Sequence, residues 1–281
     1  MAEATGLTVE TDSLGLRDNT GIVWILEEGN VFRRRIDEAD EVPKGTLAHA
    51  PVLTIRPAHG VTKAVVLVLH GGRANSYEPV RARHLSPSRM IPFAKLLHRE
   101  GSRYGLSVWS LRNRVRGWNG AERSPVQDAR WALEKIREEH SSVPVYLVGH
   151  SMGGSVAIAV ADDPLVKAIV SLAPWTDADS PTEPVRDRKV LIIHGDKDKW
   201  TSAPSSQHFA ERAVGFAQAV FYVRLRGAGH FMFDKVAIWH QLTAAFVLRQ
   251  FGSEFQLPLK ARTTRLADRL YQLPQRLLTE L

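Results

Sequence analysis

The sequence contains no cysteine, so disulfide bonds and thiol chemistry are excluded. It also lacks a run of about eighteen apolar residues, the length that a membrane-spanning helix requires. The first six residues have neither the basic nor the apolar segment of a secretory signal peptide. The simplest expectation is a cytoplasmic protein without disulfides and without an integral membrane segment.

Composition and charge narrow the class of protein further. The 281 residues are 44% hydrophobic and 24% charged, which is ordinary for a globular domain. The formal net charge is +7, but the basic residues are spread through the chain and no nucleic-acid-binding motif accompanies them. We therefore expect a globular protein that does not bind nucleic acid.

No internal repeat or low-complexity linker divides the chain. A regular pattern of elements occupies residues 49–252, which we predict to be one domain. Residues 1–48 are predicted to be an N-terminal extension packed on its core. Within that extension, residues 21–26 fit either a strand or one turn of a buried helix.

Residues 253–281 are predicted to be a C-terminal helical extension. Leu266, Leu270, Leu273 and Leu277 fall at helical spacing, although Pro274 interrupts the pattern. The favoured interpretation is a helix docked on the domain. The alternatives are a homodimer contact through this helix or attachment to an anionic membrane surface.

Short apolar runs alternate with helix-like segments from residue 51 onward. Residues 51–55 are predicted to be an edge strand, and the continuous apolar run at 64–69 is typical of a parallel strand covered on both faces. Further strands are expected at 106–111, 145–148, 168–173, 190–195 and 219–226, with helices at 86–101, 124–136, after 151, at 203–218 and at 234–251. This alternation predicts an α/β fold whose mostly parallel, twisted sheet carries helices on both faces.

The most specific local pattern is Gly149-His150-Ser151-Met152-Gly153, which lies between an apolar strand and a small-residue helix. A serine exposed at the end of a strand needs a strained turn, and glycines two positions before and after it let the strand and helix pass closely. The helix also directs its free N–H groups toward negative charge that develops beside the serine. Ser151 is therefore a candidate nucleophile.

Ligands bind at the carboxyl ends of the strands in such a sheet. Those ends carry His70-Gly71-Gly72, residues 112–119, Ser151, Pro174-Trp175, residues 196–198 and Gly229-His230. In these markers and their order, the chain resembles the α/β-hydrolases over roughly residues 51–252. The order of Ser151, Asp198 and His230 is the one that this fold uses for nucleophile, acid and base.

The resemblance implies a Ser151, His230 and Asp198 triad. Backbone N–H groups of Met152 and Gly72 are the candidate oxyanion donors. Asp196 competes with Asp198 for the role of the acid. Asp177 and Asp179 are further alternatives for the acid. The N–H of Arg73 is the alternative to that of Gly72 as an oxyanion donor. His150 lies on the wrong side of the turn to act as base, and His194 is expected to pack at the end of its strand.

Only about sixteen residues, 174–189, separate the strands on either side of the position where many members insert a lid, so no large cap domain fits. We expect a site that is open, or covered only by the loop from Arg73 to Leu85 and the N-terminal segment, and that is lined by Tyr77, Trp118 and Trp175. Arginines near the strand ends, namely Arg73, Arg112, Arg114 and Arg116, are candidates for binding a carboxylate or phosphate.

The resulting hypothesis is a capless, esterase-like serine hydrolase. It would cleave a small-molecule carboxylic ester or thioester through an acyl-enzyme, with no metal and no cofactor. The fold also hosts acyl transfer, amide cleavage and carbon–carbon bond cleavage, and it serves as a non-catalytic ligand-binding receptor. An intact triad without a cap argues against the receptor.

Overall fold

The computed structural model describes residues 50–258, residues 265 and 268, and the backbone of 22–27, 30–35 and 278–280. Within these described residues, ten strands form one sheet, in the spatial order β10-β9-β8-β7-β6-β4-β5-β3-β1-β2. The strands are β1 Ile22–Glu27, β2 Asn30–Arg35, β3 Val52–Arg56, β4 Ala64–Leu69, β5 Leu106–Arg112, β6 Val145–His150, β7 Val166–Leu172, β8 Lys189–Gly195, β9 Ala219–Leu225 and β10 Leu278–Glu280. Strands β4 to β9 run parallel, which confirms the predicted mostly parallel sheet.

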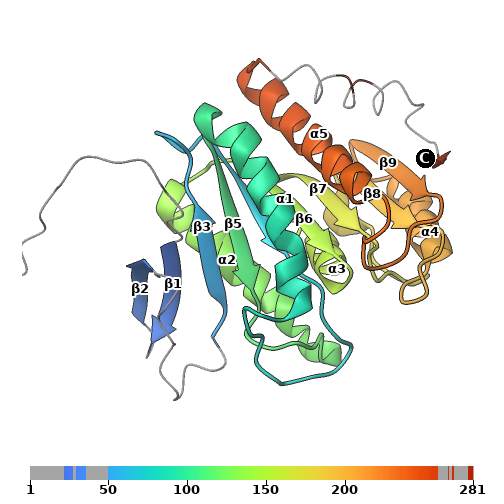
Figure 1. The fold of residues 1–281 in the computed structure, drawn as a ribbon, viewed down its shortest axis with the longest axis horizontal. Helices are drawn as coiled ribbons and strands as arrows, with labels where there is room; N and C mark the ends of the chain where they lie inside the picture. The colour runs from blue at the N-terminus through green and yellow to red at the C-terminus, as the bar shows by residue number, and fades with distance from the viewer. Residues whose placement is uncertain are drawn as a thin grey trace, which may run out of the picture.

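In the part of the chain that the structure describes, five α-helices cover the two faces of this sheet (Figure 1). They are α1 Leu85–Gly101, α2 Ser124–His140, α3 Met152–Ala159, α4 Ala203–Ala213 and α5 Val236–Phe255, with short 3₁₀ helices η2 Ser102–Tyr104, η3 Gly120–Glu122 and η4 Glu183–Val185. Helices α1 and α5 lie side by side on one face, and α2, α3 and α4 pack on the other. Two separate apolar cores result, one on each side of the sheet.

Strand β4 shows why its sequence is apolar throughout. Successive side chains of a strand point to opposite faces. Val65 and Leu67 therefore join the core beneath α2 and α3, whereas Val66 and Val68 join the core beneath α1 and α5. All six residues of β4 are buried, as expected of a central strand covered on both faces.

The prediction that residues 51–55 form an edge strand was wrong. Strand β3 pairs with β5 on one side and with β1 on the other, both in antiparallel register. The extra neighbour is the segment that the sequence left open between strand and helix, and it forms β1. Because it lies thirty residues earlier in a poorly patterned part of the chain, short-range periodicity could not reveal this pairing.

The connection between β7 and β8, residues 173–188, contains only the short helix η4. No cap domain is therefore inserted at this point. The leucines that suggested a C-terminal helix lie outside the described residues, and residues 278–280 form β10, parallel to β9. The division into residues 1–48, 49–252 and 253–281 stays a prediction. In the described part of the chain, no helix is long and apolar enough to cross a membrane.

Candidate active site

The tight turn between β6 and α3 places Ser151 at the carboxyl edge of the sheet. Ser151 has φ 55° and ψ −121°, a strained conformation for a residue with a side chain. A Cβ on Gly149 would lie 2.0 Å from the carbonyl oxygen of Gly153, and one on Gly153 would lie 2.5 Å from that of Leu69. Both positions therefore require glycine, as the sequence pattern predicted.

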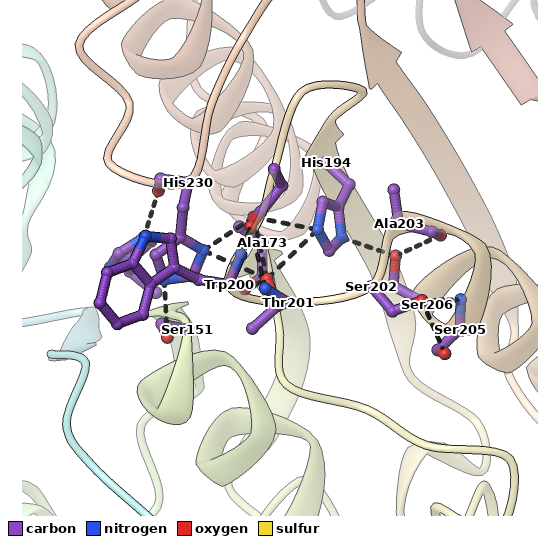
Figure 2. Close-up of polar contacts among 12 residues, drawn as sticks. Ser151, Ala173, His194, Trp200, Thr201, Ser202, Ala203, Ser205, Ser206 and His230 are labelled. Carbon is purple, nitrogen blue, oxygen red and sulfur yellow. Dashed lines mark hydrogen bonds and ion pairs between the residues drawn. The ribbon is translucent and has the colours of Figure 1, made fainter.

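Three side chains from three different loops meet at this turn. His230, in the β9–α5 connection, has its Nε2 3.0 Å from Ser151 Oγ (Figure 2). Its Nδ1 lies 2.7 Å from Asp198 Oδ2, in the β8–α4 connection. Because Asp198 can only accept when ionised, His230 donates from Nδ1 and its Nε2 is free to accept the serine proton. The structure thus brings together the three residues that the sequence predicted.

The carboxylate of Asp198 is buried and densely hydrogen-bonded. Its Oδ1 accepts from the backbone N–H groups of Trp200 and Thr201, at 2.7 and 2.9 Å, and its Oδ2 also accepts from the Thr201 hydroxyl at 2.9 Å. Burial alone would raise the pKa of Asp198, but hydrogen bonds from His194, His230 and these backbone groups outweigh it and lower the pKa. The carboxylate is therefore ionised when it holds His230.

The competing acids lie elsewhere. Asp196 is exposed and accepts from the backbone N–H of Gly227 at 2.6 Å. Asp177 bonds the hydroxyl of Ser180 and the N–H of Asp179 in an exposed turn. Geometry therefore selects Asp198 as the partner of His230.

His150 is buried beside the site without facing the serine. Its Nε2 donates to the carbonyl oxygen of His230 at 2.9 Å. Burial, with the nearby positive charges of His230 and Arg89, lowers the pKa of His150 to about 3. His150 is therefore a neutral imidazole that supports the backbone of His230.

The candidate oxyanion donors lie against each other. Gly71 and Gly72 follow β4, and a Cβ on Gly71 would be 3.2 Å from Cβ of Ser151. A Cβ on Gly72 would be 2.4 Å from the Met152 side chain. Met152 begins α3, so its N–H has no acceptor within the helix. The alternative donor, the N–H of Arg73, already bonds the carbonyl of Arg116 at 2.8 Å.

A cavity of about 870 Å³ opens beside Ser151. Its lining residues are His70, Gly71, Gly72, Arg73, Ala74, Val80, His84, Leu85, Ser86, Pro87, Arg89, Arg116, His150, Ser151, Met152, Trp175, Trp200, Thr201, His230 and Phe231. The predicted residues Arg73 and Trp175 are among them. The cavity is large enough for a substrate of ordinary metabolite or drug size.

Two predicted lining residues are placed differently. Tyr77 is 64% exposed, and its hydroxyl donates to Glu122 Oε2 at 2.9 Å. Trp118 lines a neighbouring cavity of about 310 Å³, which it shares with Trp175. The two indole rings meet edge to face with centroids 6.1 Å apart. Trp175 therefore lines both cavities.

The arginines near the strand ends divide into two groups. Arg112 is turned away from the larger cavity and donates to the carbonyl of Val80 at 2.7 Å. Arg114 likewise bonds Gln127 and pairs with Asp128. Arg73 and Arg116 line the cavity.

The lining residues that sequence reasoning did not name include Trp200, Phe231 and Arg89. Trp200 and Phe231 each lie within two positions of a triad residue, a signal that could have identified them. Arg89 lies in helix α1 far from any motif, so only the packing of that helix reveals it. Within the described residues, no three His, Asp or Glu side chains are grouped so as to hold a metal ion.

Comparisons with known proteins agree with this architecture. A family model described as serine aminopeptidase, S33, matches residues 112–189, which include the Ser151 turn but neither Asp198 nor His230. No curated protein matches the sequence significantly.

Solved structures resemble the chain in fold at low identity. Est1E from Butyrivibrio proteoclasticus is 13% identical with a TM-score of 0.56, covering 83% of this chain and 99% of its own. A serine hydrolase without a lid from Xanthomonas campestris is 18% identical with a TM-score of 0.50, covering 75% and 91%. The esterase Est2 from Thermogutta terrifontis, with propionate bound, is 18% identical with a TM-score of 0.55, covering 75% and 92%.

Proposed function

We propose that this chain, which has the fold of the α/β-hydrolases, is a serine hydrolase that cleaves carboxylic esters or thioesters through an acyl-enzyme intermediate. The observation that carries the proposal is the unbroken path of hydrogen bonds from Ser151 Oγ through His230 to Asp198, with donor–acceptor distances of 3.0 and 2.7 Å. Both distances are within the range needed for proton transfer before any substrate is bound.

In the acylation step Ser151 Oγ attacks the carbonyl carbon while His230 Nε2 takes its proton. The tetrahedral intermediate collapses, the bond to the leaving oxygen or sulfur breaks, and His230 protonates that atom. Water then attacks the acyl-enzyme with His230 again as base, which releases the acid and restores Ser151. Asp198 holds the imidazole by its Nδ1–H and stabilises the imidazolium at each stage.

The negative oxygen of each tetrahedral intermediate needs two fixed donors. The backbone N–H groups of Met152 and Gly72 are proposed for this role, because both residues lie against the Ser151 turn. The dipole of α3 adds positive potential at the same point. Removing one donor of this kind typically costs about 2.7–4 kcal/mol in the barrier.

Ester or thioester cleavage is favoured over peptide cleavage by the charge of the cavity. An aminopeptidase must bind the cationic amino terminus of its substrate, and carboxylates or other acceptors do this. The cavity wall contains three arginines and, among the described residues, no Asp or Glu. A protonated amine would be repelled by these charges. Est2 from Thermogutta terrifontis, whose fold resembles that of this chain, is named as an esterase.

The test is covalent labelling with a fluorophosphonate probe, followed by peptide mass mapping. We expect the label on Ser151 alone, and no label on Ser151→Ala. The matched control is Ser155→Ala, one turn along α3, whose hydroxyl bonds the carbonyl of Trp175 and which should label normally. Labelling of another residue, or turnover of p-nitrophenyl butyrate by Ser151→Ala at the wild-type rate, would overturn the proposal.

A further inference from the structure

The charged side chains that line the cavity beside Ser151 are all arginines. Arg73, Arg89 and Arg116 line it, and no carboxylate appears among its described lining residues. Arg116 is paired with Glu78 outside the wall at 2.6 Å. Within the described part of the chain, Arg73 and Arg89 have no such partner. Two unpaired guanidinium groups therefore border the space that a substrate would occupy.

Arg89 is the more constrained of the two cations. Its guanidinium carbon lies 4.8 Å from the ring centroid of Phe231 and 5.0 Å from that of Phe233. Its Nε is buried and has no hydrogen-bond acceptor among the described residues. Aromatic rings attract a cation but do not neutralise it or accept its in-plane N–H bonds. The packing thus holds a fixed charge in the wall. The terminal NH₂ groups, which have no hydrogen-bond acceptor in the part of the chain that the structure describes, are the donors left for an acceptor in the cavity.

The charge lies close to the reacting atoms. Phe231, which contacts Arg89, directly follows His230 in the chain. Arg89 is also near enough to His150, the neighbour of Ser151, to contribute to the lowering of its pKa, after burial and the charge of His230. An anion held by Arg89 would therefore be a part of the substrate that binds beside the triad.

The pKa of His84 is also affected by the positive charges around the cavity. His84 lines the cavity at the start of α1. Burial lowers its pKa, and the charges of Arg116, Arg81 and Arg83 lower it further, against a smaller opposing effect of Glu78. The net potential at this side of the cavity is therefore positive, which favours bound anions.

We propose that the substrate carries an anionic group, a carboxylate or a phosphate, that Arg89 binds with the help of Arg73 while Ser151 attacks the ester or thioester carbonyl. This inference rests on the proposed function and names its substrate class. The anionic group is not transformed. The bond that breaks is the acyl bond, and water supplies the oxygen and proton of the products.

Paired esters test the proposal on both sides of the scissile bond. For an anion on the leaving group, 4-acetoxybenzoate and 4-acetoxyphenyl phosphate are compared with methyl 4-acetoxybenzoate. For an anion on the acyl group, the p-nitrophenyl half-ester of glutarate is compared with p-nitrophenyl hexanoate. We expect kcat/KM to be at least about tenfold higher for the anionic member on one side, because a charge-assisted hydrogen bond typically contributes that much. The side that responds identifies the location of the anion, and the response to carboxylate or phosphate identifies its kind.

The variants are Arg89→Met and Arg73→Met, with Lys95→Met as the matched control. Lys95 is an exposed cation of helix α1, the helix that carries Arg89, and lies outside the cavity wall, so its replacement removes an equal charge. Arg89→Met should lower kcat/KM for the preferred anionic ester about tenfold or more and change the neutral ester less than threefold. Arg73→Met should have a smaller effect of the same kind, and Lys95→Met should leave the preference intact.

A second measurement applies if Arg89→Met does not fold. Glutarate or inorganic phosphate should inhibit hydrolysis of the neutral ester by the wild-type protein, and added salt should weaken the inhibition. Preference for the neutral esters, absence of inhibition, or an equal loss on both members of a pair would overturn the inference while neutral-ester turnover upholds the proposed function. If the wild-type protein neither hydrolyses any ester nor reacts with the fluorophosphonate, both fail together.

Discussion

His194 Nε2 lies 3.2 Å from Asp198 Oδ2, the same carboxylate oxygen that His230 Nδ1 contacts at 2.7 Å. Figure 2 shows Thr201 between the two imidazoles, and its hydroxyl is 3.3 Å from His194 and 3.1 Å from His230. The carboxylate accepts only, so His194 must carry its proton on Nε2. Its Nδ1 then accepts from the hydroxyl of Ser206 at 2.7 Å.

His194→Phe is expected to lower kcat about tenfold with little change in KM. The substitution keeps an aromatic ring at a fully buried position but removes a hydrogen bond to an ionised acceptor, an interaction worth about 1.5–3 kcal/mol. Only part of that free energy reaches the transition state, because Asp198 keeps its other donors. Steady-state kinetics with p-nitrophenyl butyrate measure the effect.

His194→Gln provides the matched control, because its amide can donate to Asp198 again. It should recover most of the lost kcat, whereas a role in packing alone would favour the aromatic replacement. Wild-type kcat in His194→Phe would show that His194 only fills space at the end of β8.

Asp198→Asn should lower kcat about 10³–10⁴-fold, because an amide at this position can donate to the imidazole and stabilise the wrong tautomer. The matched control is Asp196→Asn, two positions earlier, whose main contact is the N–H of Gly227. Its turnover should stay within about twofold of wild type. Comparable losses in both variants would contradict the assignment of Asp198, provided that circular dichroism shows both to be folded.

The glycines of the elbow could be predicted from the sequence because both requirements fall within one short turn. Gly149 is needed where the strand packs on Gly153, and Gly153 is needed where the turn packs on the carbonyl oxygen of Leu69 at the end of β4. The central strands could be predicted equally well from their apolar runs. Every residue of β4 is buried, so its sequence alternates between two apolar cores rather than between core and solvent.

The residues that line the cavity beside Ser151 could be predicted only in part, because the lining depends on packing between distant segments. Trp175 directly follows a strand-end residue and was identified, whereas Arg89 reaches the cavity through the rotation of α1 against the sheet. Tyr77 lies in the same loop as Arg73 yet points to Glu122. The conformation of the loop decides which of its side chains line the cavity, and a loop conformation produces no periodic pattern in the sequence.

Gly72→Ala should lower kcat at least about a hundredfold, which corresponds to the loss of one oxyanion donor, about 2.7–4 kcal/mol. The added Cβ would lie 2.4 Å from the Met152 side chain and 2.5 Å from the carbonyl oxygen of Arg116. The methionine can move, but the backbone oxygen cannot, so the Gly72 N–H must shift. Pre-steady-state acylation with p-nitrophenyl acetate measures the loss.

Gly215→Ala is the matched control for that substitution. Its added Cβ would meet only the carbonyl oxygen of Arg212, at an ordinary 3.7 Å. Its kcat should equal that of wild type. A Gly72→Ala variant that acylates at the wild-type rate would place the second oxyanion donor on another residue.

His70 couples the free energy of unfolding to pH. Its Nδ1 donates to the carbonyl of Gly71 at 2.7 Å, and its Nε2 accepts from the N–H of Asn113 at 3.1 Å. The bond from Asn113 requires the neutral ring, and burial is the main cause that lowers the pKa of His70 to about 4. An unfolded histidine has a pKa near 6.5, so acid protonates the unfolded chain first. Stability from His70 is thus complete above about pH 6.5 and is lost as pH falls toward 4, by up to about 3 kcal/mol.

His70→Gln should therefore flatten the decline of unfolding free energy between pH 6.5 and 4.5, because an amide can donate and accept without titrating. Urea unfolding at several pH values measures this slope. The comparison must be between variants, because burial raises the pKa of Asp128 to about 6, which adds stability as pH falls and opposes the histidines. The exposed His59→Gln should keep the wild-type slope. An unchanged slope in His70→Gln would mean that His70 is protonated in the folded protein, with its contact to Asn113 rearranged.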